Sequence, residues 1–260
     1  MPGLSVVIIS YNEAENIGRC IDSVKRVADE VILIDSFSTD RTVEIATARG
    51  AIVKQSQFYG YINQKNKAIN MAGNDFVLLL DADEALSEEL ADSILAEKNN
   101  FPFSGYSMNR CSFFCGKFIK RGLWYPDRKL RLFDKRLGYC GGMNPHDRII
   151  MNEDVAIKHL KGDLLHYSFD SLDEYYERNE AVSTIAAQSL FEAGIKKNRS
   201  KQILSPAWAF INGYFLRLGF LDGSLGLVIA LHTANQSFSK YQKLRRMHKQ
   251  DVKKMIWEKI

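Results

Sequence analysis

The first hundred residues alternate between continuous hydrophobic runs and segments whose hydrophobic residues recur at helical spacing. Leu4–Ser10 is a run rich in β-branched residues, which is typical of a strand buried on both faces of a parallel sheet. The segment 16–27 then presents one apolar stripe, formed by Ile17, Cys20, Ile21 and Val24. These two patterns predict a buried strand followed by an amphipathic helix.

The same alternation continues to about residue 98. Ser38–Asp40 supplies capping residues for a second helix, and Gly50 ends it. Further strands are predicted at 31–35, 51–54 and 76–80, and further helices at 64–71 and 87–98. Repeated strand and helix segments imply right-handed crossovers and a parallel sheet with helices on both faces. The sequence therefore predicts an α/β fold.

The pattern changes after the helix at 87–98. Strands are predicted at 105–114 and 129–134, with a loop at 124–128 between them. Alternation in the second of these strands places Lys129 and Arg131 on one face. Glycines 138, 141 and 142 predict a flexible turn.

From Ser171 onward the chain reads as helical, with strongly apolar and aromatic stretches at 203–220 and 225–231. Neither stretch reaches the roughly 18 uninterrupted apolar residues of a membrane span. We expect interfacial helices, in which Trp208 and Phe215 enter a leaflet while Arg217 and the lysines after it contact anionic headgroups. Packing of the same residues against the catalytic domain or another subunit is the alternative.

Composition narrows the functional classes only slightly. With 260 residues and 46% hydrophobic content, the chain can form one large domain or a domain with an appendage. A net charge of +4 is too small to indicate nucleic-acid binding, and the basic residues crowd the last twenty or so positions, where anionic lipid is a possible partner. The first residues lack a signal-peptide pattern, so we expect a cytoplasmic protein.

Two carboxylates follow the most hydrophobic of the predicted strands. Residues i and i+2 of an extended segment point the same way, so Asp81 and Asp83 can converge on one ligand just beyond Leu80. Hard oxygen ligands of this kind suit Mg²⁺ or Mn²⁺, which neutralise the phosphates of a substrate. The pair predicts a divalent-metal site, although an acidic surface turn would share this short motif.

Other polar residues also follow predicted strands. Ser10–Glu13 and Asp35 come at the ends of the first two strands, and Asp81–Asp83 follows the fourth. Ligands of parallel sheets lie beyond the carboxyl ends of the strands, so three distant segments are expected to meet in one crevice. The first strand is not followed by G-x-G-x-x-G, which argues against a dinucleotide cofactor.

Four segments together resemble the family 2 glycosyltransferases: 5–16, 35–40, 64–68 and 80–84. This resemblance implies the GT-A fold, a Rossmann-like domain with a mostly parallel central sheet and flanking helices, here with a C-terminal helical extension. Residues 144–147, 165–167 and the helical tail are similar to the bacterial subgroup of lipopolysaccharide core β-1,4-glucosyltransferases. Residues 1–170 are then the catalytic domain, with a nucleotide-sugar half to about 100 and an acceptor half after it. Residues 171–260 form the extension.

The resemblance implies inverting transfer of a sugar, glucose from UDP-glucose, to a saccharide or glycolipid of the cell envelope. The enzyme would work in the cytoplasm, peripherally on the inner face of the cytoplasmic membrane. Another nucleotide sugar, used for polysaccharide or glycolipid synthesis, is the alternative.

Residue roles follow from the same resemblance. Ser10 and Tyr11 line the base pocket, Glu13 supports it, Asp35 accepts a hydrogen bond from uracil, and Lys65 lies near the nucleotide. Asp81 contacts the ribose or a metal-bound water, and Asp83 binds the metal.

The chemistry of transfer adds two further requirements. Negative charge grows on the leaving diphosphate, where the metal, helped by Arg128 or Arg131, would stabilise it. Inversion also needs a carboxylate that takes the proton of the acceptor hydroxyl. Asp147 is the candidate base, although the subgroup usually has His-Glu where this chain has His146-Asp147.

Alternatives remain for the base and for the reaction. Glu153 and Asp154 are the rival bases, in a segment that also reads as a polar hairpin turn. His146 is expected either to orient the base or to approach the diphosphate. His166 is read as a structural histidine, with a metal or acceptor role as its alternative. Haloacid dehalogenase-like phosphatases also use an aspartate pair, but after their first strand. A catalytically inactive GT-A scaffold is the non-enzymatic alternative.

Overall fold

The computed structural model describes residues 2–143, 146–195 and 199–257. Its contacts divide the chain into two compact units: unit 1 comprises Met1–Ser112 and Asp127–Ser168, and unit 2 comprises Phe113–Pro126 and Phe169–Ile260. The sequence placed a domain boundary at 170 and assigned 113–126 to the catalytic domain, whereas the contacts group 113–126 with the C-terminal helices.

The parallel half of the sheet in unit 1 has the order β3-β2-β1-β4. Its strands are β1 (Leu4–Ser10), β2 (Glu30–Asp35), β3 (Ile52–Gln55) and β4 (Phe76–Asp81). The connecting helices are α1 (Ile17–Val24), α2 (Thr42–Ala48) and α3 (Tyr61–Met71). The predicted α/β fold class is confirmed, and the element bounds agree with the sequence pattern to within about three residues.

Alternate residues of β1 serve two separate hydrophobic cores. Leu4, Val6 and Ile8 pack in a core shared with α1 and with α4 (Glu88–Lys98). Val7 and Ile9 pack instead in a core that includes residues of α3. Every residue of β1 is buried, which explains why this strand reads as a continuous hydrophobic run.

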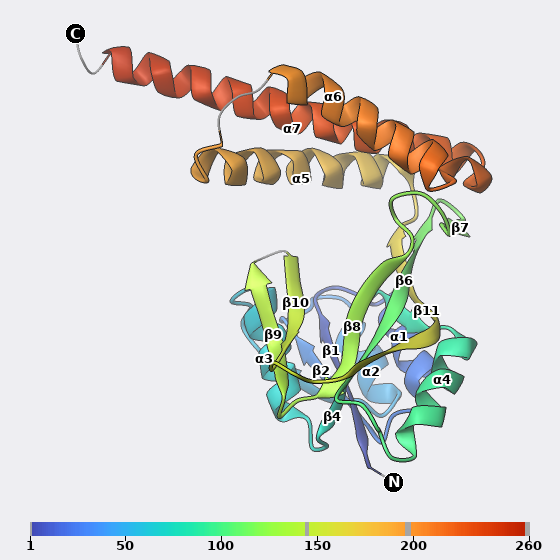
Figure 1. Ribbon diagram of the computed structural model, residues 1–260. Helices are drawn as coiled ribbons and strands as arrows, with labels where there is room; N and C mark the ends of the chain where they lie inside the picture. The colour runs from blue at the N-terminus through green and yellow to red at the C-terminus, as the bar shows by residue number, and fades with distance from the viewer. Residues whose placement is uncertain (1, 144–145, 196–198, 258–260) are drawn as a thin grey trace. The chain divides into compact units, whose positions relative to one another are not determined.

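Antiparallel strands continue the sheet beyond β4 in the order β8-β6-β11-β5 (Figure 1). They are β5 (Glu84–Leu86), β6 (Gly105–Phe114), β8 (Asp127–Asp134) and β11 (Ile157–Phe169). β8 pairs with β4 in antiparallel register, with Leu132 opposite Leu78. This pairing brings Arg131 beside the end of β4, where Asp81 lies.

The prediction of a flexible turn at the glycines near residue 140 is wrong. Gly138, Gly141 and Gly142 lie within strand β9 (Gly138–Met143), which pairs with β10 (His146–Met151). A Cβ atom at Gly138 would lie 2.4 Å from Met151 Sδ, and one at Gly141 would lie 2.7 Å from the Ile150 side chain. These two glycines therefore permit close strand packing.

Gly162 illustrates a second close approach, between β11 and α4. Its φ is +87°, and an added Cβ would lie 2.3 Å from the backbone nitrogen of Leu90. We expect Gly162→Ala to lower the free energy of unfolding by about 3 kcal/mol or more, because left-handed strain and a backbone clash act together.

Gly50 provides the matched control for this substitution. Its φ is +86°, but nothing lies within 4 Å of an added Cβ. Gly50→Ala should therefore cost only about 1 kcal/mol from backbone strain. Urea titrations of the two variants measure the difference, and equal losses would contradict the proposed contact with α4.

Unit 2 is built mainly from long helices. They are α5 (Leu172–Glu192), α6 (Arg199–Phe210), the π-helical turn η1 (Ile211–Leu216), the 3₁₀ turn η2 (Gly219–Asp222) and α7 (Ser224–Trp257). Helix α7 packs against both α5 and α6 (Figure 1), so the predicted C-terminal helical extension is confirmed. The buried core of unit 2 is formed by Phe114, Ile119, Tyr175 and Ile229. Across the ranges that the structure describes, no helix is both long and apolar enough to cross a membrane.

Candidate active site

The parallel strands bring three predicted site residues to one edge of the sheet. In the register, Ser10 lies opposite Asp35, and Ile9 lies opposite Asp81. The carboxyl ends of β1, β2 and β4 are therefore level with one another. The predicted convergence of these strand-end side chains follows directly from the parallel register.

The Asp35 carboxylate is fully buried and organises the loop that follows it. Its Oδ1 accepts hydrogen bonds from Ser10 Oγ at 3.1 Å and from the Ser38 hydroxyl. Its Oδ2 accepts from the Ser38 backbone N–H at 2.9 Å and from Gln55 Nε2 at 3.3 Å. Asp35 thus joins the ends of β1, β2 and β3.

The loops after β1 and β2 are joined by side-chain hydrogen bonds. Asn12 Oδ1 accepts from the Thr39 backbone N–H at 2.8 Å, and the Ala14 N–H donates to Asp40 Oδ2 at 3.0 Å. Asn12 has φ of 54°, a left-handed conformation that asparagine tolerates. Tyr11 beside it is 60% exposed, so its ring is open to a ligand at this edge.

Asp81 is held between two cationic side chains. Lys65 Nζ lies 2.9 Å from its Oδ1, and Arg131 Nη2 lies 2.8 Å from its Oδ2. Burial would raise the pKa of this carboxyl, but the charges of Arg131 and Lys65 outweigh burial and hold the pKa well below its usual range. Asp81 is consequently ionised, and both of its oxygens are already engaged.

Arg131 extends this network behind Asp81. Its Nη2 lies 2.7 Å from Glu84 Oε1, and Glu84 Oε2 accepts a 3.0 Å hydrogen bond from the Asp81 backbone N–H. Arg110 Nη1 lies 3.7 Å from the same Glu84 Oε1, and its Nη2 lies 2.9 Å from Asp127. Burial alone would lower the pKa of Arg131, but Glu84 and Asp81 raise it above its usual value.

Replacing Arg131 tests the stabilising role of this network. We expect Arg131→Met to lower the free energy of unfolding at pH 7 by about 3 kcal/mol, because it removes the cation that lies between the buried Glu84 carboxylate and the partly buried Asp81 carboxylate. Arg128→Met is the control, since Arg128 is exposed in the same strand, and it should change stability by less than about 0.5 kcal/mol. Urea titration measures both changes, and similar small losses would contradict the assignment.

The same variant should alter the acid dependence of stability. The pKa of Asp81 is depressed in the folded protein, so its contribution is present above the unfolded pKa, near 3.8, and is lost as pH falls below it. Arg131→Met removes part of that depression. Its stability should therefore fall less steeply below about pH 4 than that of the wild type.

Asp83 faces His166 on the neighbouring strand β11. His166 Nε2 lies 3.2 Å from Asp83 Oδ2. The other ring nitrogen, Nδ1, is 2.7 Å from Ser168 Oγ and 3.4 Å from Ser112 Oγ. These contacts fix the ring so that Nε2 points to the carboxylate, and both side chains are partly open to solvent.

Asp147 reaches the same cluster from β10. Its Oδ2 lies 2.9 Å from Lys65 Nζ, so one buried ammonium group contacts both Asp81 and Asp147. Burial of Lys65 would lower its pKa, but the two carboxylates outweigh burial and raise it. Cys140 Sγ lies 3.7 Å from Asp147 Oδ2, and burial, reinforced by this carboxylate, raises the pKa of its thiol to about 12.

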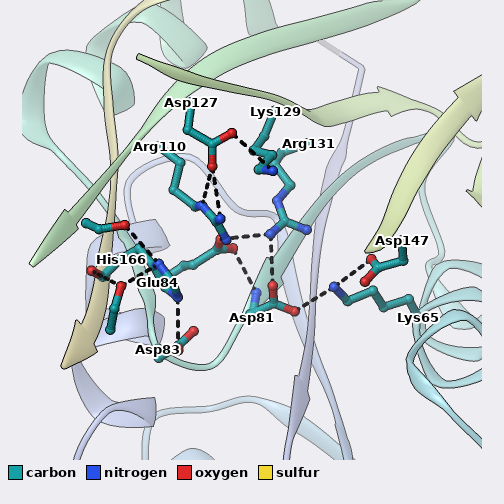
Figure 2. A network of polar contacts seen from close by, with 12 residues as sticks. Lys65, Asp81, Asp83, Glu84, Arg110, Asp127, Lys129, Arg131, Asp147 and His166 are labelled. Carbon is teal, nitrogen blue, oxygen red and sulfur yellow. Dashed lines mark hydrogen bonds and ion pairs between the residues drawn. The ribbon is translucent and has the colours of Figure 1, made fainter. Parts of the chain in front are cut away.

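Figure 2 shows two neighbouring sets of contacts. The larger set joins Asp81 to the cations around it and to Asp147 from β10, and the smaller set joins Asp83 to His166 from β11. The labelled residues are Lys65, Asp81, Asp83, Glu84, Arg110, Asp127, Lys129, Arg131, Asp147 and His166. They comprise five carboxylates and four cationic groups beside one histidine, so with neutral histidine one negative charge is in excess. Such a balance suits a divalent cation.

Several predicted site residues lie apart from this cluster. Glu13 accepts backbone hydrogen bonds at the start of α1. Arg128 is exposed on β8, where its charge adds to burial in lowering the pKa of His159. Glu153 and Asp154 are exposed in the turn that follows the end of β10. Asp147 lies near the start of the same strand, at the other end of the hairpin. His146 begins β10, and its side chain lies outside the described residues, as do residues 144–145.

Sequence reasoning missed Glu84, Arg110 and Cys140. Glu84 directly follows the aspartate pair, so its position was a usable signal. Arg110 and Cys140 had no comparable signal, because their contacts depend on which strands pair and in which register. His166, predicted to be a structural histidine with a metal or acceptor role as the alternative, lies 3.2 Å from Asp83.

The family model and the similar proteins described below all point to glycosyltransferases. A family model described as glycosyl transferase family 2 matches residues 5–157. An uncharacterized glycosyltransferase of Rickettsia typhi is 34% identical over 257 residues, covering 95% of this chain and 88% of the relative. A lipopolysaccharide core biosynthesis glycosyltransferase, LpsC of Rhizobium meliloti, is 28% identical over 254 residues, covering 92% and 93%. The solved structure of S. aureus TarS 1–349 in complex with UDP-GlcNAc is 16% identical, with a TM-score of 0.48 over 96% of this chain and 92% of that one.

Proposed function

The chain belongs to glycosyl transferase family 2 and is a glycosyltransferase with the GT-A fold, and from this premise we propose that it transfers glucose from UDP-glucose to an envelope saccharide. The acceptor would be a lipopolysaccharide core saccharide or another lipid-linked saccharide. The observation that carries the proposal is the contact of Lys65 Nζ, at 2.9 Å, with both Asp81 and Asp147. Similarity to the lipopolysaccharide core enzyme LpsC supports the acceptor class.

The proposed reaction is a single displacement at the anomeric carbon. The acceptor oxygen forms the new glycosidic bond as the bond to the UDP oxygen breaks, and the acceptor proton passes to Asp147. The described contacts of the Asp147 carboxylate are made by Oδ2, so Oδ1 is the proposed proton acceptor. Lys65 positions this base by holding its other oxygen. UDP leaves with the displaced electron pair.

Asp83 and His166 are the residues that would hold a divalent metal. The described residues contain no cluster of three or more metal-ligating side chains. Mg²⁺, however, is commonly bound through one or two protein ligands together with substrate phosphates and water. The partly exposed Asp83 carboxylate fits that pattern, and the His166 imidazole, 3.2 Å from it, would be a second ligand for a transition metal such as Mn²⁺. When bound, the metal would neutralise charge on the leaving diphosphate.

Asp81 has a different part in this proposal. The sequence suggested it as a metal or ribose contact, but two cations already engage its oxygens. We propose that Asp81 keeps Lys65 and Arg131 in place, while Asp83 provides the carboxylate to the metal. Arg131 would then act on the diphosphate only through its effect on Asp81, because its side chain is buried.

The nucleotide is proposed to bind over the ends of β1 and β2. The exposed ring of Tyr11 would contact the uracil, and Ser10 would line the pocket. Asp35 lies below them with both oxygens accepting hydrogen bonds, so a uracil N–H would have to replace one of its present donors. The proposed place of action is the cytoplasm, at the membrane surface where a lipid-linked acceptor would be presented.

A panel of nucleotide sugars tests this function. Purified protein would be titrated with UDP-glucose, UDP-galactose, UDP-N-acetylglucosamine and GDP-mannose, each with and without Mg²⁺ or Mn²⁺, by calorimetry. We expect metal-dependent binding with preference for UDP-glucose. Preference for another sugar would reassign the donor, and absence of binding to the whole panel would overturn the proposed function.

A further inference from the structure

The helices of unit 2 expose an unusual amount of apolar surface. In α6 and η1 the exposed large side chains include Ile203, Leu204, Trp208, Ile211 and Phe215, with exposed fractions from 44% to 70%. The spacing of three, four and seven residues among Leu204, Trp208, Ile211 and Phe215 places these four on one helical face. The face of this segment that meets solvent is therefore its apolar face, the reverse of an ordinary surface helix.

Helix α7 repeats the arrangement and adds charge. Leu227, Leu231 and Phe238 are exposed at helical spacing in its first half, and the exposed stripe continues through Arg246 and Lys249. The same helix face thus changes from apolar to cationic along its length. This combination is typical of helices that lie in a membrane interface.

The positive charge of residues 199–250 indicates which kind of partner the exposed apolar face can bind. Residues 199–250 contain eight lysines and arginines, whereas the only acidic residue is Asp222, which is 8% exposed. A second copy of this chain would bring two strongly basic surfaces together, and their like charges would repel. An anionic lipid surface removes that repulsion and accepts the apolar side chains.

We propose that the exposed apolar face of α6, η1 and α7 binds anionic phospholipid bilayers. Trp208, Phe215 and Leu231 would enter the headgroup and acyl boundary, while Arg217, Arg246 and Lys249 contact lipid phosphates. The site shares no residue with the proposed sugar-transfer site, since all of its residues belong to unit 2 and the acidic cluster belongs to unit 1. Membrane binding needs no nucleotide sugar, so each proposal can fail alone.

Vesicle flotation of the full-length protein tests the proposal. We expect binding to vesicles of phosphatidylglycerol and phosphatidylethanolamine, weaker binding to pure phosphatidylcholine, and loss of binding as salt rises. The double variant Trp208→Ser with Phe215→Ser should weaken binding by about tenfold or more. The pair Arg246→Glu with Lys249→Glu should weaken binding to the anionic vesicles by about tenfold as well.

Ile52→Ser is the matched control, because Ile52 is a 48% exposed apolar residue in unit 1 and its loss should leave vesicle binding unchanged. Circular dichroism spectra and thermal unfolding midpoints of every variant, measured in parallel, report whether the proteins remain folded. Failure of the wild type to bind anionic vesicles, or binding by both double variants as tight as that of the wild type, would overturn the proposal. Dimerisation of the wild type without vesicles, lost in Trp208→Ser with Phe215→Ser, would assign the surface to self-association instead.

Discussion

Asp147→Asn is expected to lower the rate of glycosyl transfer by about 10² to 10⁴-fold while leaving UDP binding nearly unchanged. The substitution keeps the size of the side chain and an oxygen that can accept a hydrogen bond from Lys65, but it removes the carboxylate that takes the acceptor proton. Release of UDP from UDP-glucose in the presence of acceptor measures the rate, and calorimetry with UDP measures donor-site binding.

Glu153→Gln is the matched control for that experiment. Glu153 is an acidic residue in the exposed turn after β10, so its neutralisation should leave transfer at the wild-type rate. Near-normal transfer by Asp147→Asn, together with a large loss in Glu153→Gln or Asp154→Asn, would move the base to that turn. The variant that loses transfer activity therefore shows whether the base is Asp147 or a residue of that turn.

Asp83→Ala should reduce metal-dependent transfer by a factor on the order of a thousand, since a bound metal contributes several kcal/mol to the stabilisation of the leaving charge. The side chain of Asp83 is partly exposed and contacts His166, so its loss should leave the thermal unfolding midpoint nearly unchanged. Transfer rates measured across a series of Mn²⁺ concentrations test the effect.

Asp92→Ala is the control for Asp83→Ala, because Asp92 is an exposed aspartate in a surface ion pair with Arg26. It should retain the full metal response. If Asp83→Ala keeps wild-type turnover at every Mn²⁺ concentration, the metal does not depend on Asp83. His166→Ala is then expected to be equally silent, since the two side chains form one proposed site.

Most of the fold could be predicted because, in the N-terminal half, the local sequence pattern of each segment indicates whether it forms a strand or a helix. The strands around Val7 and Leu79 are continuous buried runs, and the helices between them carry clear apolar stripes such as Ile17 to Val24. Parallel pairing then fixes which ends meet. For this reason the meeting of Ser10, Asp35 and Asp81 could be predicted without a structure.

The hairpin β9–β10 could not be predicted, because glycine usually marks a turn. Gly138 and Gly141 lie in a strand since their neighbours Met151 and Ile150 occupy the space that a Cβ would need. Only the partner strand makes this requirement visible. The same hairpin carries Asp147, so the route by which this residue reaches Lys65 was equally hidden.

The partners of the charged residues were also hidden. Sequence spacing indicated that Asp81 and Asp83 share a site, but not that cations would engage Asp81 while His166 faces Asp83. Those contacts depend on β8 and β11 joining the sheet beyond β4. Pairings of this kind join residues about fifty to eighty positions apart, which local patterns do not report.

The most direct test of the central claim is the position of the metal and the diphosphate in crystals grown with UDP and Mn²⁺. The account predicts an anomalous peak for manganese between Asp83, His166 and the UDP phosphates, with the acceptor side of the site facing Asp147. A manganese ion bound elsewhere, or UDP bound away from the ends of β1, β2 and β4, would contradict the proposed transferase site.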